Sequence, residues 1–165
     1  MLGKPKAGTS GAPVPNGLSA PSTNAVSVHQ TSAKRVTWNA NGQTLTYSLA
    51  PTDMSGFEVF SFRAAQTNSA LNPVTGNVEF EVRLKSGTRT QAVYTGRFFP
   101  IPRPYDRPSW PVDQNVMNTV RVPIHSFIIT AAIANRVDLT AIDTVQLTFF
   151  TSQGEIFVDD VEFSR

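Results

Sequence analysis

Hydrophobic and polar residues alternate with a period of two along several short stretches of the chain. In the clearest stretch, residues 78–85, the apolar set is Val78, Phe80, Val82 and Leu84, and the polar set is Glu79, Glu81, Arg83 and Lys85. The same alternation recurs at residues 44–49, 120–124 and 144–149. Because neighbouring side chains on a β-strand point to opposite faces, each stretch predicts a strand with one buried face.

The segments between these stretches indicate an all-β fold. Residues 57–62 are apolar on both faces, as in a central strand, and Pro123 indicates a strand end or an edge strand. Asn41-Gly42 has the residues that a type I′ hairpin turn needs. Only Ser126 to Val137 could form a helix, and a short one. Seven to nine short strands with little helix predict a β-sandwich or barrel.

The first 24 residues differ from the rest in composition. They contain four Pro and four Gly among Ser, Thr and Ala, and only two side chains the size of leucine, Leu2 and Leu18. Such a segment buries too little apolar area to offset its ordering entropy. We therefore predict a flexible linker at residues 1–24 and one β-sandwich domain at residues 25–165.

Composition and charge exclude several classes of protein. The chain has no Cys, which excludes disulfides, a thiol nucleophile and thiolate metal sites. The net charge is +2, but no acidic residue precedes Asp53, so the positive excess belongs to the front of the chain and gives no nucleic-acid-binding surface. The longest nearly apolar run, Phe127 to Ala134, is too short to span a membrane, and the N-terminus lacks the apolar core of a secretory signal.

Three C-terminal segments and one earlier segment resemble a known family. They are Asn118–Phe127, Val137–Phe149, Gly154–Phe163 and Gly56–Arg63. They are similar to the closing half and to one earlier strand of galactose-binding-like jelly-roll domains, which include carbohydrate-binding modules appended to secreted bacterial enzymes. The resemblance implies a jelly-roll β-sandwich of two antiparallel sheets. It also implies a non-catalytic role in targeting a linked enzyme to polysaccharide, and an extracellular location.

Two adjacent acidic residues, Asp159 and Asp160, interrupt the apolar run of the last predicted strand. An inward-facing carboxylate is costly unless it is paired or binds a cation. In the resembled family a structural calcium ion often lies near the final strand, which implies Asp159 and Asp160 as metal ligands here. An acidic residue near the first strand usually completes that site, and this chain has none before Asp53. The alternative is that backbone amides or an arginine such as Arg63 cap the two carboxylates.

A proline-rich stretch, Phe98–Pro111, is the first candidate ligand surface. Five prolines stiffen it and lower the ordering cost of the side chains that it displays. Aromatic faces stack on sugar rings, and planar charged groups hydrogen-bond pairs of hydroxyls. The candidate ligand residues are Tyr105, Asp106, Arg107 and Trp110. Alternatively, the loop folds back over the sandwich and Trp110 seals the edge of the core.

The outward side chains of the central strands form a second candidate surface. Alternation places them opposite the core, and the ligand candidates among them are Arg83, Arg121 and Gln146, with Glu79, Glu81 and Thr148 nearby. Phe150 is the only aromatic residue in phase with Gln146. If these strands share the concave sheet of a jelly roll, they form a polar surface for a polysaccharide chain. The alternative is a solvated face of Arg–Glu cross-strand pairs.

Three functions remain open. The first is a non-catalytic carbohydrate-binding module covalently linked to a catalytic domain. The second is a structural or protein-interaction sandwich that binds no sugar, marked by an exposed apolar patch built from Phe98, Phe99 and Ile101. The third is a small carboxylate-dependent glycoside hydrolase, for example through Glu79 and Glu81. The chain has none of the short hydrolase or phosphate-binding motifs, which favours a protein that is not an enzyme.

Overall fold

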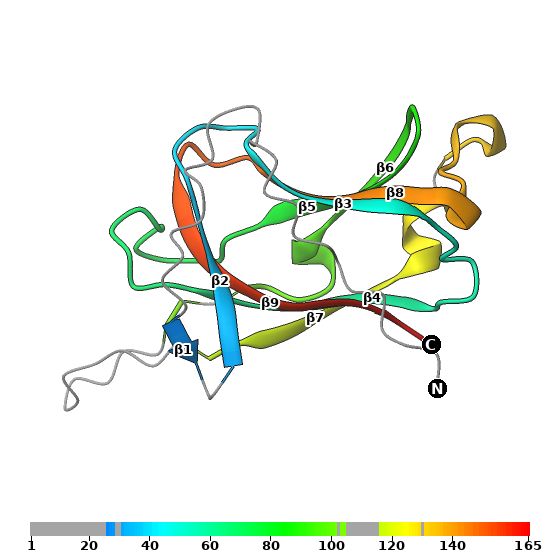
Figure 1. The fold of residues 1–165 in the computed structure, drawn as a ribbon. Helices are drawn as coiled ribbons and strands as arrows, with labels where there is room; N and C mark the ends of the chain where they lie inside the picture. The colour runs from blue at the N-terminus through cyan, green and yellow to red at the C-terminus, as the bar shows by residue number, and fades with distance from the viewer. Residues whose placement is uncertain (1–25, 29–30, 102, 105–115, 130) are drawn as a thin grey trace.

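The computed structural model describes residues 26–28, 31–101, 103–104, 116–129 and 131–165 (Figure 1). Two antiparallel β-sheets pack face to face. Their strands are β1 (Val26–Val28), β2 (Thr31–Trp38), β3 (Thr44–Thr52), β4 (Val59–Gln66), β5 (Phe80–Ser86), β6 (Arg89–Tyr94), β7 (Asn118–Pro123), β8 (Ile142–Phe149) and β9 (Gly154–Ser164).

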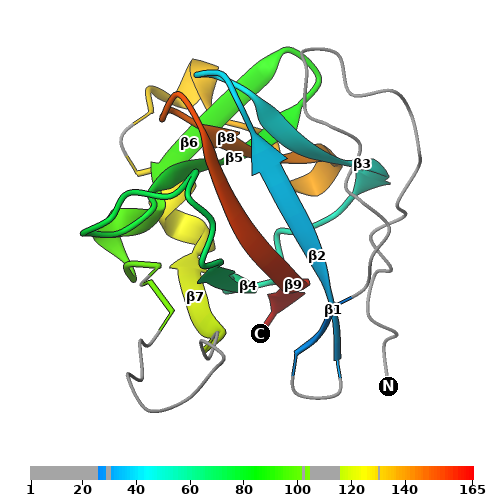
Figure 2. The same ribbon diagram turned by 90° about the vertical axis from the view of Figure 1, so that its left-hand side faces the viewer.

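The strand order is that of a jelly roll rather than of two simple meanders. One sheet has five strands in the order β1-β2-β9-β4-β7, and the other has four in the order β3-β8-β5-β6. Sequence neighbours such as β2 and β3, or β8 and β9, belong to different sheets, so the chain crosses repeatedly between the layers (Figure 2). The predicted all-β, jelly-roll sandwich is confirmed.

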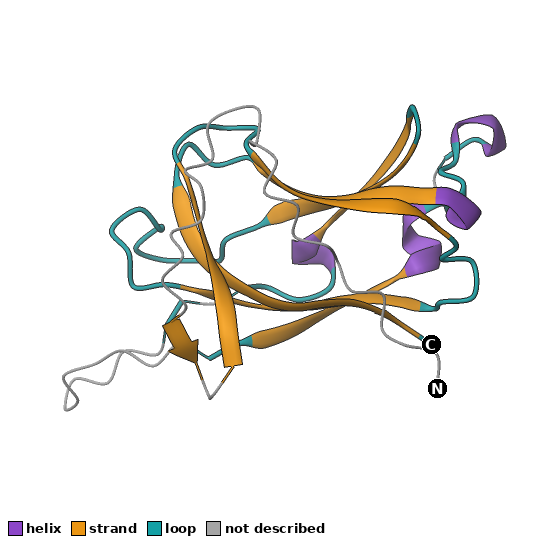
Figure 3. Ribbon diagram, viewed as in Figure 1, coloured by secondary structure: helices purple, strands orange, loops and turns teal. Residues whose placement is uncertain are grey.

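Helical structure in the described residues is confined to short 3-10 turns (Figure 3). They are η1 (Thr95–Arg97), η2 (Ile124–Phe127), η3 (Ile133–Asn135) and η4 (Leu139–Ala141). The stretch 126–137, expected to allow one short helix, instead contains the end of η2 and all of η3. Its isoleucines and Thr130 are poor helix formers, which favours isolated turns.

The core consists of the inward-facing residues of both sheets. Val78, Phe80, Val82 and Leu84 are all buried, as their alternation predicts. Trp38 of β2 stacks on Phe149 of β8 across the sandwich, with ring centroids 4.1 Å apart, so Trp38 belongs to the core. β4 is a central strand between β9 and β7, and β7 ends at Pro123 on the edge of its sheet, both as predicted.

The prediction of a hairpin at Asn41-Gly42 is wrong. β2 and β3 lie in different sheets, so this turn is a corner between the layers. Gly42 has a φ of 83°, whereas Asn41 is not among the described residues with positive φ, and a type I′ turn needs positive φ at both positions. The Gly42 amide donates to the carbonyl of Phe149 at 2.7 Å, which ties the corner to β8.

A β-bulge interrupts the last strand at Asp160. Before it Ile156 and Val158 face the core, and after it Val161 and Phe163 pack against the core. Arg63 pairs with Asp159 and Ser61 with Glu162, so two residues of β9 oppose the single residue between them on β4. Asp160 has a φ of 46°, a left-handed conformation that Asp tolerates better than most residues. The bulge leaves Asp160 exposed and so accommodates this acidic residue within the apolar run.

The predicted linker, residues 1–24, lies outside the described residues, so the domain boundaries remain a prediction. In the described part of the chain, no helix has both the length and the apolar character needed to cross a membrane.

Candidate functional site

The outer face of the four-stranded sheet, the side turned away from the five-stranded sheet, presents a grid of mostly polar side chains. The register sets them in three rows across the sheet. Each row is given in the strand order β3, β8, β5, β6. The first row is Thr44, Thr148, Glu81 and Tyr94, the second is Thr46, Gln146, Arg83 and Ala92, and the third is Ser48, Thr144, Lys85 and Thr90. Alternation therefore does bring the sequence candidates Arg83 and Gln146 together, as adjacent partners on β5 and β8.

An aromatic cluster lies at one end of this face, formed by Tyr94, Phe150, Arg83 and Glu81. The rings of Tyr94 and Phe150 are stacked, with centroids 5.9 Å apart and planes inclined by 29°. The Arg83 guanidinium lies over the Phe150 ring at 5.8 Å. Glu81 Oε2 accepts a bond from Arg83 Nε at 2.9 Å and also lies 2.8 Å from Nη2. Each group of the cluster is thus held by another, so little ordering entropy would be lost when a ligand contacts them.

Polar groups next to the cluster are arranged for hydrogen bonding. Gln146 Nε2 donates to Thr46 Oγ1 at 3.1 Å, which fixes the orientation of the side-chain amide. An amide carries two hydrogens and one oxygen, so it can keep this bond and still engage a hydroxyl. Thr148 lies on the same face but is only 2% exposed and presents no accessible hydroxyl.

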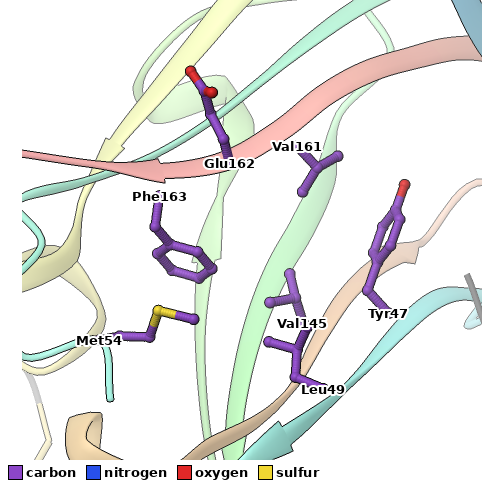
Figure 4. A pocket seen from close by; sticks show the side chains of 7 residues that line it. All are labelled: Tyr47, Leu49, Met54, Val145, Val161, Glu162 and Phe163. Carbon is purple, nitrogen blue, oxygen red and sulfur yellow. The ribbon is translucent and has the colours of Figure 1, made fainter. Parts of the chain in front are cut away.

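The shape of the sheet suits an extended ligand better than the interior does. In Figure 1 the β2–β3 connection and the tip of the β5–β6 hairpin rise above the middle of the four-stranded sheet. A hollow between the sheets holds only about 20 Å³, room for about one water molecule. Figure 4 shows that side chains such as Tyr47, Met54 and Phe163 surround it, with the Glu162 carboxylate directed away. A sugar ring does not fit there.

Arg121 does not belong to this face. It lies on β7 of the five-stranded sheet and pairs with Ser61, so its exposed side chain is on the opposite side of the sandwich from Arg83. Alternation along one strand tells the two faces of that strand apart but does not tell which sheet the strand joins. The structure therefore separates Arg121 from the other strand candidates.

The first candidate ligand set, Tyr105, Asp106, Arg107 and Trp110, lies outside the described residues. What the structure does give is the start of their loop. Ile101 is fully buried and bridges to Val78, and its carbonyl accepts a bond from Gln66 on β4 at 2.5 Å. The Arg103 guanidinium donates to the carbonyl of Pro73. This set therefore remains a prediction.

The acidic pair of β9 has the contacts of the capping alternative. Asp160 Oδ2 lies 3.3 Å from Arg63 Nη1, and Asp159 Oδ1 accepts a bond from the backbone amide of Asp160 at 2.9 Å. Asp159 Oδ2 is buried with no hydrogen-bond partner in the described part of the molecule. No cluster of three or more Asp, Glu or His residues occurs among the described residues. As the side chains lie, they do not fit a calcium site, and calcium remains an untested prediction.

Tyr94 is the residue of the candidate site that sequence reasoning missed. Its signal was present: Val93 faces the core, so alternation along Arg89–Tyr94 places Tyr94 outward. What the sequence could not give is the pairing of β6 with β5, which brings Tyr94 opposite Glu81 and near Phe150. The predicted polar face therefore does carry an aromatic surface.

No known protein-family profile matches this chain, and no curated protein matches it. Solved structures do. A family 11 carbohydrate-binding module from Clostridium thermocellum, in complex with a β-1,3-1,4-mixed-linked tetrasaccharide, is 16% identical with a TM-score of 0.55, over 84% of this chain and 79% of that one. A family 30 module of a cellulosomal cellulase of Clostridium thermocellum is 10% identical with a TM-score of 0.61, over 93% and 84%.

A third match is part of a larger enzyme. A β-1,2-glucanase from Parabacteroides distasonis is 13% identical with a TM-score of 0.51, over 80% of this chain but only 18% of that one. At these identities the likeness concerns the fold. The chain has the jelly-roll β-sandwich fold of bacterial carbohydrate-binding modules, as its sequence resemblance implied.

Proposed function

We propose that this chain is a non-catalytic carbohydrate-binding module that holds a linked enzyme on polysaccharide. The observation that carries the proposal is the aromatic cluster on the outer face of the four-stranded sheet. Tyr94 and Phe150 offer flat apolar surface to a sugar ring, while Arg83, fixed by Glu81, and Gln146 offer hydrogen bonds to its hydroxyls. Tethering then raises the local concentration of the enzyme on its substrate.

The comparisons support a linked arrangement. The glucanase carries a domain of this fold within a much longer chain, and the family 30 module belongs to a cellulosomal cellulase. By extension, we propose a covalently linked catalytic domain for this chain and an extracellular location. Glu81, one of the two carboxylates considered for hydrolysis, is committed to Arg83, which favours a binding role for this face over catalysis.

Native affinity electrophoresis against a panel of soluble polysaccharides tests the proposal. The expected result is retardation of the wild-type protein by at least one glycan. Tyr94→Ala should weaken that retardation about tenfold or more, because the stacking surface is lost. Phe99→Ala is the matched control: Phe99 is 43% exposed, against 42% for Tyr94, but lies outside the four strands of the sheet. Equal retardation of wild-type and Tyr94→Ala would contradict this site.

An interaction domain without sugar binding is the second candidate, and one observation favours it. Ile129 and Ile133, in the connection that contains η3, are 60% and 80% exposed. Side chains of Arg89 and Gln91 on β6 donate to the carbonyls of Arg136 and Asn135 and brace this connection. No retardation by any glycan would favour this function, and replacement of both isoleucines by Ser should then abolish binding to the linked domain.

The interaction-domain hypothesis predicted an exposed apolar patch built from Phe98, Phe99 and Ile101, and this prediction is wrong. Ile101 is fully buried and Phe98 packs against the core, which leaves only Phe99 substantially exposed.

A further inference from the structure

Glu155, at the start of β9, is the only Asp, Glu, Lys, Arg or His side chain that is buried among the described residues. Three neighbours bind its carboxylate. Oε1 accepts from Thr67 Oγ1 at 2.7 Å, and Oε2 accepts from Thr37 Oγ1 at 3.0 Å and lies 2.7 Å from Arg35 Nη2. A buried carboxylate needs such partners, because desolvation otherwise costs several kcal/mol, by order of magnitude.

The backbone of Glu155 binds the same region of the chain. Asn72 Nδ2 donates to the Glu155 carbonyl and Asn72 Oδ1 accepts from the Glu155 amide, both at 2.8 Å. Asn72 Nδ2 also donates to the carbonyl of Thr67 at 2.8 Å. Side chain and backbone of one residue thus fasten the beginning of the connection between β4 and β5 to β9.

That connection in turn holds the start of the proline-rich loop. The carbonyl of Pro73 accepts a hydrogen bond from the Arg103 guanidinium, and Val78 forms an isolated antiparallel β-bridge with Ile101. Gln66 Nε2, just before the connection, donates to the carbonyls of Ile101 at 2.5 Å and Gly76 at 3.3 Å. The contacts run in sequence from Glu155 to residues 67–78 and on to Ile101 and Arg103.

We propose that Glu155 is an acid-sensitive latch. When charged, it holds residues 67–78, and with them the described start of the proline-rich loop, against β9. When protonated, it releases residues 67–78 while the core of the sandwich stays folded. The device does not depend on sugar binding, since none of its hydrogen bonds and ion pairs involves a residue of the aromatic cluster.

The charges around the latch set the direction of the effect. β2 contributes Arg35, whereas the described residues 67–72 contribute no charged group. Burial alone would raise the pKa of Glu155, but the hydrogen bonds from Thr67, Arg35 and Thr37 outweigh it and lower the pKa below the ordinary 4.5. A lowered carboxyl pKa gives stability that is present above the unfolded value and is lost as the pH falls through the folded value. The latch is therefore closed at neutral pH and opens in acid.

Hydrogen exchange by mass spectrometry, followed from about pH 7 to about pH 3 and corrected for intrinsic exchange, tests the latch. In the wild type, peptides covering residues 67–78 should keep their protection down to about pH 4.5 and lose it below that, by up to about tenfold per unit of pH, before β5 and β8 do. Glu155→Gln should abolish this pH dependence. Asp160→Asn, which removes one charge from an exposed position on the same strand, should behave as wild type.

Two results would overturn the proposal: residues 67–78 losing protection only together with β5 and β8, or Glu155→Gln keeping the wild-type pH dependence. If Glu155→Gln does not fold, Thr67→Val tests the same point, since it removes the 2.7 Å hydrogen bond to the Glu155 carboxylate, together with two longer bonds of Thr67 Oγ1 at 3.5 Å, and retains the charge. In Thr67→Val, residues 67–78 should then be released at a higher pH than in the wild type. An unchanged pH of release in Thr67→Val would equally contradict the latch.

Discussion

Gly154 lies against the ring of Trp38 and leaves no room for a side chain. A methyl group at residue 154 would overlap the Trp38 ring, which is itself stacked on Phe149 and donates from Nε1 to Thr151 Oγ1 at 2.9 Å. The ring is buried and fixed on two sides, so it cannot move aside easily. Glycine at residue 154 is therefore required by packing, and not by its backbone angles.

Gly154→Ala should destabilise the domain by about 1–3 kcal/mol, the usual cost of overpacking a core. Urea unfolding followed by tryptophan fluorescence measures the change. Gly56→Ala is the control, because its methyl group would meet only Arg165 Nη2 at an ordinary 3.5 Å. Equal stability of Gly154→Ala and wild type would show that Trp38 can shift without cost.

Tyr47 gives a second prediction, for alkaline pH. Burial, and then the negative charge of Asp159, raise the pKa of Tyr47 far above its ordinary value of 10.0. A raised pKa gives stability that is present below the unfolded value and is lost as the pH rises. Above about pH 10 the free energy of unfolding should fall by about 1.4 kcal/mol per pH unit from this group. Tyr47→Phe should remove this loss of stability. The control Tyr94→Phe, at an exposed position, should show the same loss as the wild type. Urea titrations at several alkaline pH values measure the free energy of unfolding of each variant.

At the scale of elements, the sequence predicted what depends on local periodicity. The alternation at residues 78–85 and 144–149 predicted β5 and β8 with the right buried faces, since one side of each strand must meet the core. It could not predict which strands pair. Asn41-Gly42 looks like a hairpin locally, but tertiary packing sends β2 and β3 to different sheets. Alternation put Arg83, Gln146 and Arg121 on the outward faces of their strands. Arg83 and Gln146 do lie on neighbouring strands, but Arg121 lies on the other sheet, because alternation does not tell which sheet a strand joins.

The bulge in β9 leads to a prediction about calcium. Asp160 is paired with Arg63, and the left-handed backbone at Asp160 accommodates this acidic residue in an otherwise apolar strand. Adding a chelator should therefore leave the melting temperature unchanged, as measured by differential scanning calorimetry of protein prepared with calcium. A fall of several degrees would instead restore Asp159 and Asp160 as ligands of a structural ion.

At the scale of the whole molecule, the chain offers two candidate ligand surfaces, the aromatic cluster and the proline-rich loop, and the candidate residues of the loop lie outside the described residues. The aromatic cluster lies on the four-stranded sheet. The described start of the proline-rich loop is fastened to the β4–β5 connection, which the latch joins to β9 of the five-stranded sheet. Variants at the aromatic cluster and in the loop can therefore be compared to tell which of the two surfaces binds the glycan.

The comparison of Tyr94→Ala with Trp110→Ala makes that separation. If the four-stranded sheet binds the glycan, Tyr94→Ala should lose retardation in affinity electrophoresis, while Trp110→Ala and Arg121→Ala should be retarded like the wild type. Thermal melts of Tyr94→Ala and Arg121→Ala should stay close to that of the wild type, because Tyr94 and Arg121 are exposed. Loss of retardation in Trp110→Ala alone, with an unchanged melt, would move the binding site to the proline-rich loop. A large fall in the melting temperature of Trp110→Ala would instead mean that Trp110 seals the core edge.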